Sequence, residues 1–419
     1  MLDIKIIREN PEMVQDIIEK RNLTLDVQEF LQLDQKKRDL IVKTDELRTL
    51  KNKVSKEIPT LSNEEKPAKI AEMKKVWEDL KVLEEEQNSV NAQWNQQYYK
   101  FPNLLDPTAA IGNTDDDNSR EYYSWDKPEF DFPIKAHYEI WEKKGWIDIE
   151  KGSEISGSRF WYLKGDLVLL QLALQNYAVS KLTAKGFSPM LPPVLVREKA
   201  MFGTGFFPVD EDGIYQVNPG EDDLYLVGTS EVPVTSYHSG QTLDLENPIM
   251  YAGISPCFRR EAGSAGKDTR GILRGHQFDK VEMVTFCRPE DSQKMHDFMV
   301  GIEEDIWKSL GIPYQKMNVC SGDLGNPAMK KFDLEAWMPA QDAYREVTSC
   351  SNVWEFQSRR LGIKCKDSQG NTQFAHTLNG TVIAMGRCLI SIIENYQTSE
   401  WNVKIPEVLV PFMGGKTEI

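Results

Sequence analysis

The sequence predicts an α+β protein in which a long antiparallel helical hairpin precedes a larger domain built on an antiparallel β-sheet. Two observations carry this prediction. Residues 27–57 contain no Pro or Gly and repeat an apolar residue every seven positions, which is typical of a coiled-coil helix. Beyond residue 118, short β-like runs alternate with helices and turns, and no internal repeat is apparent.

The length and composition indicate a globular protein of two or three domains. The chain has 419 residues, of which 40% are apolar and 27% charged, which excludes wholesale disorder. No stretch approaches the roughly eighteen uncharged apolar residues of a membrane helix, and the charged start excludes a secretory signal. Six widely spaced cysteines without a Cys-x-x-Cys pair suit free thiols in a reducing compartment. We therefore expect a cytoplasmic protein without a membrane span.

The helical hairpin is predicted from two apolar seams of similar length. The first seam contains Leu33, Leu40, Leu47 and Val54, and the second contains Met73, Val76, Leu80, Leu83, Gln87, Val90 and Trp94. The second helix begins either after a capping box of Ser62 and Glu65 or at Pro67. About thirty residues at roughly 1.5 Å each give an arm about 45 Å long. Such an arm has no concave pocket, so its function is expected to be contact.

The charge of the chain is uneven. The net charge of -15 argues against a general nucleic-acid coat. Residues 33–58, however, hold eight basic and five acidic residues, a local surplus of three positive charges (8 − 5 = +3). We name this segment the basic strip. It is interpreted either as a strip that contacts phosphates or as an ordinary solvated helix face.

The segment that follows the arm changes character. Residues 101–118 resemble a linker, because they are rich in Pro, Gly and Asp. Strands are predicted within 248–258, 278–286 and 343–351, and an amphipathic helix at 166–185 is stopped by Gly186. Neither a phosphate-binding P-loop nor a Gly-x-Gly-x-x-Gly sequence occurs, which removes the two commonest nucleotide folds.

The candidate chemistry lies on a predicted hairpin around a loop with Gly263, Gly266 and Gly271. Strand alternation places Arg259 and Glu261 on one face, and Phe278 and Glu282 on one face of the return strand. An arginine can grip a carboxylate or phosphate, and a phenylalanine can stack on a base. A surface hairpin of alternating charge is the plainer alternative.

Three segments resemble the conserved motifs of class II aminoacyl-tRNA synthetases. The motif 1 resemblance covers about 166–196 and includes 186–193; the motif 2 resemblance covers about 250–286, and the motif 3 resemblance about 376–397. The whole chain to about residue 413 is similar to bacterial-type seryl-tRNA synthetases, including the segments 8–12, 101–105, 228–231 and 406–409.

This resemblance implies a domain plan and a reaction. A tRNA-binding domain is expected at 1–110, with its hairpin at about 27–100, and a class II catalytic domain at 111–419 with helices flanking an antiparallel sheet. The implied activity joins L-serine to the 3′ end of tRNA(Ser), and possibly of tRNA(Sec), through a seryl-adenylate made from ATP. Mg²⁺ would accompany ATP, and a homodimer is expected. No structural zinc is expected.

The resemblance also assigns the site residues. Those implied for serine are Thr229, Ser230, Glu231, Glu282, Asn379 and Thr381. Those implied for ATP are Arg259, Arg260, Glu261, Gly275, Phe278, Glu346, Val347, Thr348, Ser349 and Arg387. Arg259, Glu261 and Arg387 carry the catalytic role, and Glu346 and Ser349 would meet Mg²⁺. The family usually has Ser where this chain has Thr381, which keeps the hydroxyl and adds a methyl group.

Two other functions remain as alternatives. The first is a ligase that loads an amino acid onto a carrier protein, which the long hairpin disfavours. The second is an inactive homologue that acts as a binding protein, which the joint presence of Arg259, Glu261, Phe278, Glu282 and Arg387 disfavours.

Overall fold

The computed structural model describes residues 1–123, 127–262 and 271–419. The chain divides into two compact units, one of residues Leu2–Pro102 and one of Met1 with Asn103–Ile419. Within the described ranges, no helix has both the length and the apolar character required to cross a membrane.

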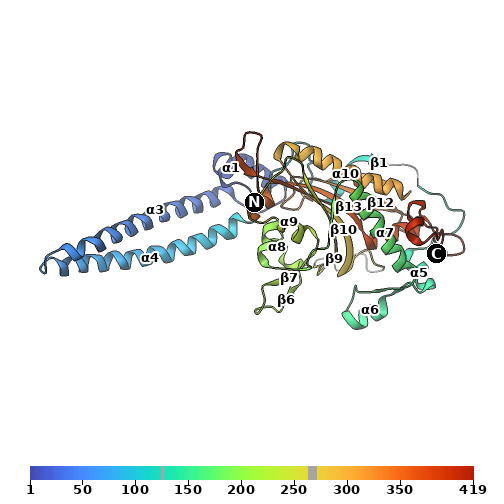
Figure 1. The fold of residues 1–419 in the computed structure, drawn as a ribbon, viewed down its shortest axis with the longest axis horizontal. Coiled ribbons are helices and arrows are strands. Elements are labelled where there is room, and N and C mark those ends of the chain that lie inside the picture. Colours follow the sequence, from blue (N-terminus) through green and yellow to red (C-terminus); the bar gives the residue numbers. More distant parts are fainter. Residues whose placement is uncertain (124–126, 263–270) are drawn as a thin grey trace. The chain divides into compact units, whose positions relative to one another are not determined.

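The N-terminal unit is entirely helical (Figure 1). Its helices are α1 (Ile4–Glu9), α2 (Pro11–Lys20), α3 (Val27–Glu57) and α4 (Lys66–Tyr98), with a 3₁₀ turn at Ile58–Thr60. The Asp26 side chain accepts the Gln28 and Glu29 N–H groups and so begins α3. Ser62 Oγ donates to Glu65 Oε2 at 2.7 Å, but this pair precedes α4, which carries Pro67 in its first turn. Of the two expected starts, the structure therefore has the one at the proline.

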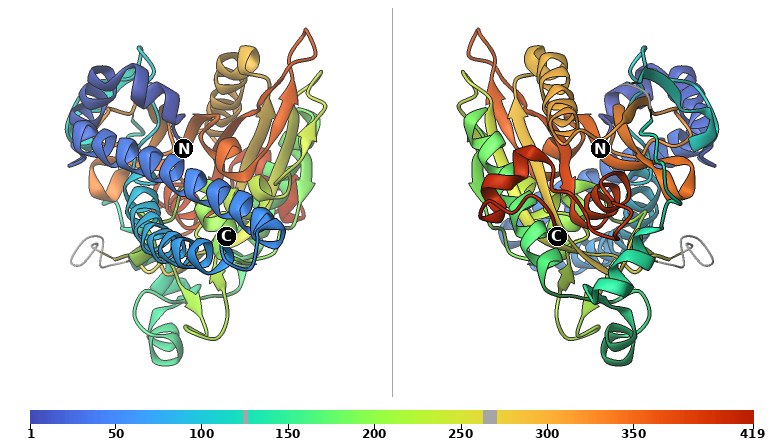
Figure 2. Two further views of the ribbon diagram at one scale, coloured as in Figure 1. Left: turned by 90° about the vertical axis from the view of Figure 1, so that its left-hand side faces the viewer. Right: turned by 90° about the vertical axis from the view of Figure 1, so that its right-hand side faces the viewer.

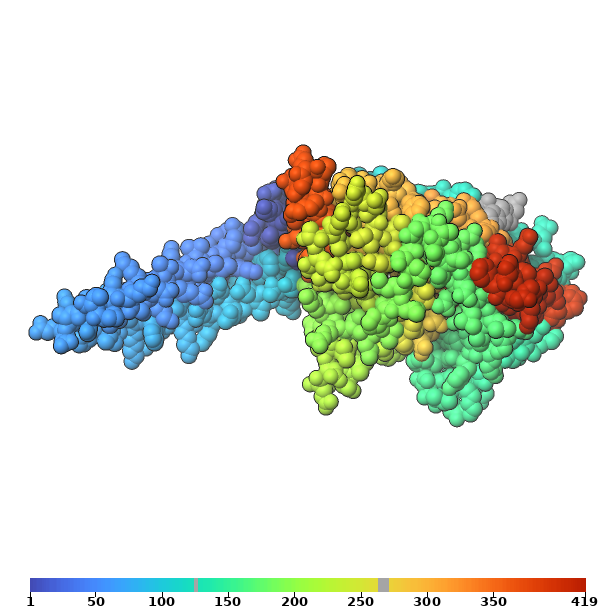
Figure 3. Space-filling view, in the orientation of Figure 1, coloured from blue at the N-terminus to red at the C-terminus, as the bar shows by residue number. Residues whose placement is uncertain are grey.

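The predicted seams of α3 and α4 are confirmed. Phe30 contacts Trp94 and Lys51 lies over Trp77, so early residues of α3 meet late residues of α4, as an antiparallel pair requires. The fully buried seam residues are Leu40, Val54, Met73, Leu80 and Val90. In the space-filling view these two helices form a narrow arm (Figure 3).

A buried acid anchors this unit in a way that the seam pattern does not reveal. Asp34 is 1% exposed, and both of its oxygens accept from Arg8, at 2.8 and 2.9 Å. The Trp94 indole also donates to it at 3.0 Å. Burial raises the pKa of Asp34, but these bonds outweigh burial and hold it below its ordinary value. The base of the hairpin is thus held by a buried carboxylate that is paired and hydrogen-bonded, rather than by an apolar residue.

The second unit is built on an eight-stranded sheet. The strands run in the order β1 (Ser119–Tyr123), β11 (Tyr314–Asn318), β12 (Lys330–Met338), β13 (Ala343–Trp354), β16 (His376–Ala384), β10 (Gln277–Cys287), β9 (Ile249–Phe258) and β4 (Ser188–Met190). Every neighbouring pair is antiparallel except β4 and β9. The α+β class and the antiparallel sheet predicted from the sequence are confirmed.

Three helices cover one face of this sheet: α7 (Asp166–Ala184), α10 (Ser292–Ser309) and α12 (Met385–Asn395) (Figure 2). Val281 and Met283 of β10 join the apolar core that these helices form. Because side chains alternate along a strand, Lys280 and Glu282 point to the other face. The helix predicted at 166–185 corresponds to α7 and ends before Gly186, whose φ of 93° suits glycine.

Smaller elements lie outside the eight-stranded sheet. They are α5 (His137–Lys144), β2 (Ile147–Asp148), α6 (Ile149–Ser156), β3 (Tyr162–Leu163), β5 (Leu195–Val196), α8 (Glu198–Thr204), β6 (Gln216–Val217), β7 (Leu224–Leu226), α9 (Glu231–Ser236), β8 (Thr242–Leu243), α11 (Phe356–Leu361), β14 (Lys364–Lys366) and β15 (Thr372–Phe374). Short 3₁₀ helices lie at Asp115–Asp117, Glu211–Gly213, Pro289–Asp291, Pro339–Gln341 and Glu407–Met413.

The motif 1 and motif 2 segments lie at one end of the strand order. β4 is the last strand and ends before Leu191, so Pro192 and Pro193 stand outside the ladder, as expected for prolines. β9 and β10 pair directly, with Gln277 opposite Phe258, and form the predicted hairpin. Gly263 and Gly266 of its loop lie outside the described residues.

Candidate active site

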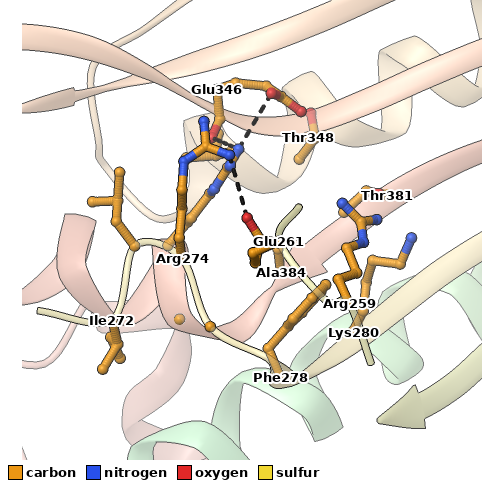
Figure 4. A pocket seen from close by; sticks show the side chains of 15 residues that line it. Arg259, Glu261, Ile272, Arg274, Phe278, Lys280, Glu346, Thr348, Thr381 and Ala384 are labelled. Atoms are coloured by element: carbon orange, nitrogen blue, oxygen red, sulfur yellow. Dashed lines mark hydrogen bonds and ion pairs between the residues drawn. The ribbon is translucent and has the colours of Figure 1, made fainter. Parts of the chain in front are cut away.

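Two adjoining cavities lie on the open face of the sheet. One, of about 210 Å³, is lined by residues implied for the nucleotide, and we call it the nucleotide cavity. The other, of about 350 Å³, is lined by residues implied for serine, and we call it the serine cavity. They share Arg259, Lys280, Glu346 and Thr381, which therefore stand where the two cavities meet. Figure 4 shows Arg259 and Lys280 side by side, with Thr381 beyond them. This junction is where two bound substrates would touch.

Glu282 is the most heavily bonded side chain of the serine cavity. It is 2% exposed, and its Oε2 accepts from Thr229 Oγ1 (2.6 Å), Ser230 Oγ (2.8 Å) and the Glu231 N–H (3.1 Å). Lys280 Nζ donates to Oε1 at 2.7 Å. Burial raises the pKa of Glu282, but Lys280 and the two hydroxyl groups outweigh burial, so its pKa lies below the ordinary value. The cavity thus holds an ionised, oriented carboxylate.

The strand register explains how these donors reach Glu282. Its neighbours across the sheet are Gly253 on β9 and Thr381 on β16. A Cβ at Gly253 would lie 2.7 Å from Ser230 Oγ, so a side chain there would occupy the space that Ser230 fills. The glycine therefore lets the N-terminal turn of α9 approach the carboxylate.

Glu231 is a second buried acid of the same cavity. Its Oε1 accepts from Gln357 Nε2 at 2.6 Å and from Asn379 Nδ2 at 2.9 Å. Burial, and then the charge of Glu282, raise the pKa of Glu231 to about 7. A cationic ligand would favour the ionised form of this group, because opposite charges lower the pKa of an acid.

Arg259 and Phe278 form one wall of the nucleotide cavity. The Arg259 guanidinium lies 5.3 Å from the Phe278 ring centroid, and its Nε donates to the Gly228 carbonyl at 3.1 Å. The two terminal nitrogens are therefore the ones positioned to bond a ligand oxyanion. Glu261 forms an ion pair with Arg274 at 3.5 Å (Figure 4).

An irregularity in β13 brings Glu346 and Ser349 to the same face. Leu334 pairs with Thr348 and Glu335 with Glu346, so Val347 is an extra residue in the ladder. Without this bulge, residues three apart on a strand would face opposite sides. Thr348 instead points to the helical face and donates to Glu303 Oε2 at 2.8 Å.

Glu346 and Ser349 carry the kinds of oxygen atom that bind Mg²⁺. Carboxylate and hydroxyl oxygens are ligands suited to Mg²⁺, which usually completes its shell with phosphate and water. Burial raises the pKa of Glu346, but the charges of Arg387 and Lys331 outweigh it and keep the carboxylate ionised. Arg387 Nη1 lies 3.3 Å from Glu346 Oε2 and donates to the Glu346 carbonyl at 2.6 Å. Among the described residues, no group of three or more His, Cys, Asp or Glu is placed to hold a metal.

Most residues implied by the sequence meet at these two cavities. Thr229, Glu231, Glu282, Asn379, Thr381 and Ser349 line the larger one, and Arg259, Glu261, Gly275, Phe278, Glu346, Val347, Thr348, Thr381 and Arg387 the smaller. Ser230 acts through its bond to Glu282 instead. Arg260 lines a separate cavity of about 690 Å³ with Glu211 and Tyr225, since it points opposite to Arg259.

Lys280, Arg274 and Gln357 are among the site residues that the sequence reasoning did not find. Lys280 lies between Phe278 and Glu282 on the same strand face, so strand alternation alone was a sufficient signal for it. Arg274 and Gln357 come from a loop and from α11, and no local pattern connects either with its partner.

Comparisons with known proteins show which family this chain is similar to. The family described as tRNA synthetase class II core domain (G, H, P, S and T) matches residues 214–396, and that described as Seryl-tRNA synthetase N-terminal domain matches residues 1–105. A serine–tRNA ligase of Rhodococcus jostii (strain RHA1) is 44% identical over 416 residues, which are 99% of each chain.

Two solved structures are similar over the full chain. Seryl-tRNA synthetase from Pyrococcus horikoshii, complexed with ATP, has 37% identity and a TM-score of 0.89, covering 100% of this chain and 99% of that one. Cytoplasmic serine–tRNA ligase from Naegleria fowleri, in complex with AMP, has 36% identity and a TM-score of 0.85, covering 100% and 98%.

Proposed function

The chain belongs to the seryl-tRNA synthetase family and has its serine–tRNA ligase function, and we propose that the two joined cavities perform its first step. In that step L-serine and ATP become seryl-adenylate and pyrophosphate. The observation that carries the residue assignment is the position of Arg259, which lines both cavities and stands between the candidate serine and nucleotide residues.

The serine cavity recognises two parts of its substrate. Glu231, held by Gln357 and Asn379, receives the α-ammonium group. Glu282 accepts the side-chain hydroxyl, and Thr381, directly across the sheet, bounds the same space. A site built to bond a hydroxyl rejects analogues without one, because its buried polar group then stays unpaired.

The nucleotide cavity binds ATP beside the serine. Phe278 offers a ring face to adenine, Glu261 accepts from its amino group, and Arg387 lies on the opposite wall. The Pyrococcus horikoshii relative was solved with ATP and the Naegleria fowleri relative with AMP, which supports a nucleotide at this place. Mg²⁺ arriving with ATP would be held by Glu346 and Ser349 and would neutralise phosphate charge.

The reaction needs positioning and charge rather than a protein nucleophile. A serine carboxylate oxygen attacks the α-phosphorus, and the bond to the bridging oxygen breaks as pyrophosphate leaves. Arg259 holds the carboxylate and then the charge that develops on the α-phosphate. A terminal hydroxyl of tRNA next attacks the seryl carbonyl, and AMP departs.

The N-terminal unit and the edge of the sheet suggest how the chain works with its partners. The basic strip on α3 would contact tRNA(Ser), and recognition of tRNA(Sec) stays a prediction. The domain boundary near residue 110 and the cytoplasmic location also stay predictions. Edge strand β4, followed by the 79% exposed Leu191, is suited to pack against its symmetry mate in a homodimer. A mass near 48 kDa by light scattering would refute that assembly.

One pair of assays tests the whole proposal. Serine-dependent exchange of pyrophosphate into ATP measures the first step, and charging of purified tRNA(Ser) measures the second. We expect both activities, with serine strongly preferred over alanine. Exchange without charging would favour a ligase for a carrier protein, although the match of residues 1–105 to the synthetase N-terminal domain disfavours it. Loss of both in folded protein would favour an inactive homologue.

A further inference from the structure

The mechanism above leaves a buried cation without a role. Lys280 on β10 is 5% exposed and lines both cavities. Its Nζ donates to Glu282 Oε1 at 2.7 Å and to Thr229 Oγ1 at 2.9 Å. Removing an ammonium group from water is costly, and a buried one is tolerated only when it is paired and bonded. Both conditions hold here, so a charged lysine is stable at this buried position.

The two carboxylate oxygens of Glu282 accept different numbers of hydrogen bonds. Oε2 already accepts from Thr229, Ser230 and the Glu231 backbone. Within the described part of the chain, Oε1 accepts from Lys280 alone. A carboxylate oxygen offers two lone pairs, so Oε1 keeps one acceptor position. Glu282 lines the serine cavity. By this count of donors, Oε1 is the oxygen left to accept from a substrate hydroxyl.

We propose that Lys280 is a positioning residue that keeps Glu282 ionised and directs its Oε1 to the substrate hydroxyl, and so sets the preference for serine over amino acids without a hydroxyl. This inference rests on the proposed function, since it assumes that serine occupies the larger cavity. Lys280 need not touch serine to act in this way.

The other charges around Glu282 explain why Lys280 is needed. Glu231 of α9, when ionised, disfavours a second negative charge beside it. Burial raises the pKa of Glu303 of α10 well above its ordinary value, which favours the neutral form of that acid. Cys257 of β9 is a buried thiol, and burial raises its pKa to about 11, so it adds no charge at neutral pH. Arg259 is cationic but belongs to the junction with the nucleotide. Lys280 is the cation that directly bonds Glu282.

Replacing Lys280 by a neutral residue would change the form of Glu282. Burial, and then the charge of Glu231, would favour the protonated carboxyl, which presents a donor where the substrate hydroxyl needs an acceptor. Serine would lose a charge-assisted hydrogen bond, whereas alanine would lose none. The ratio of the dissociation constants of alanine and serine therefore isolates the contribution of Glu282. Effects on Glu231 and Arg259 cancel in this ratio, because both amino acids carry the same ammonium and carboxylate groups.

The experiment measures the binding of L-serine and L-alanine by calorimetry. It compares the full-length wild type with Lys280→Met and Lys280→Arg. The measurements run from about pH 6 to pH 8.5, a range in which a carboxyl group with a raised pKa titrates. In wild type we expect a constant ratio, because Glu282 stays ionised. In Lys280→Met we expect a ratio about tenfold lower at the alkaline end, as when one hydrogen bond to a charged group is weakened. It should fall further as the pH decreases, whereas Lys280→Arg should keep a constant ratio. Thermal unfolding checks the fold, and Lys280→Gln replaces the Met variant if that one does not fold.

Two results would overturn the inference. One is a Lys280→Met ratio equal to that of wild type at every pH. The other is an equal, pH-independent decrease in the Met and Arg variants, since that would make Lys280 a packing residue. Both results are interpreted for a wild-type protein that shows normal serine-dependent exchange of pyrophosphate into ATP. If wild type showed no such exchange, the proposed function would fail, and this inference would fall with it.

Discussion

At the scale of single residues, the serine cavity is a set of buried polar groups whose bonds are nearly complete before substrate arrives. Glu282 has four protein donors and Glu231 has two on one oxygen. Such satisfied networks hold their members in one geometry, and a single deletion leaves the partners unpaired. The effects of substitutions should therefore be large and specific to serine.

Replacing Glu282 by alanine should abolish most serine activation. The variant loses the acceptor for the substrate hydroxyl, and the expected cost in kcat/KM is about 2–5 kcal/mol. Pyrophosphate exchange with varied serine measures it, and the KM for ATP serves as the control. Because Lys280 would be left buried without its anion, thermal unfolding and the Glu282→Gln variant accompany the assay. Exchange kinetics within twofold of wild type would show that the assignment is wrong.

The raised pKa of Glu231 predicts a pH dependence for serine alone. Its pKa of about 7 means that the carboxyl is ionised above neutrality and becomes protonated as the pH falls. Because the substrate ammonium needs the ionised form, the KM for serine should rise below about pH 7, by up to about tenfold per pH unit. The KM for ATP should not follow. The Glu231→Gln variant should bind serine weakly at every pH, and a rise that persists in this variant would assign the titration to another group.

At the scale of elements, strand register and irregularities place the site. Gly253, Glu282 and Thr381 meet because β9, β10 and β16 pair in one register. The bulge at Val347 then turns Glu346 to the face of Ser349. These are long-range features, since each depends on a partner strand distant in sequence.

The Gly253 position tests this register. In Gly253→Ala the new Cβ would lie 2.7 Å from Ser230 Oγ and 3.0 Å from its Cβ, so the start of α9 must shift away from Glu282. We expect the KM for serine to rise about tenfold, as when one charge-assisted hydrogen bond is removed, with the KM for ATP unchanged. Adding Ser230→Gly removes both clashing atoms and should recover part of the loss. No recovery would place the effect elsewhere in β9.

The basic strip of α3 allows a second test at this scale. Lys36 and Arg48 form ion pairs with Glu86 and Glu84 of α4. Lys43 and Lys53 are exposed, and within the described ranges no ion pair involves them. Replacing both by Gln should weaken tRNA binding. The logarithm of the tRNA association constant should also fall less steeply with the logarithm of the salt concentration, by roughly 0.7–0.9 for each phosphate that the variant no longer neutralises. The matched control replaces Lys36 and Arg48 by Gln, which removes the same number of charges, both of them already paired. An equal effect of the control would indicate only a general loss of positive charge.

The sequence predicts the elements of this protein better than their connections. The helices α3, α4 and α7 and the strands β9, β10 and β13 follow from local periodicity, and the site residues follow from motif resemblance. Asp34 was not predicted as an anchor because its partners Arg8 and Trp94 are far away in sequence. Gln357 was missed for the same reason. The bulge at Val347 leaves no local signal, because only pairing with β12 defines the extra residue.

At the scale of the whole molecule, the two units carry different chemistry. Every residue that lines the two cavities belongs to the second unit, whereas the basic strip belongs to the first. Binding of amino acid and nucleotide therefore requires nothing from α3 or α4. We expect the long hairpin with its basic strip, in contrast, to position a macromolecular substrate.

Deleting residues 27–99 and joining the ends with a short linker should separate the two half-reactions. Serine-dependent pyrophosphate exchange should stay largely intact, because Arg259, Glu282 and Glu346 all remain. Charging of tRNA(Ser) should fall steeply, since the arm would no longer hold the tRNA near the adenylate. Weaker binding of tRNA at low salt should accompany this loss, because phosphate contacts dominate such affinities. Thermal unfolding of the shortened protein is the control. Charging at the wild-type rate would refute a role of the arm in tRNA binding. Equal loss of both half-reactions in a folded protein would instead make the hairpin a structural part of the catalytic unit.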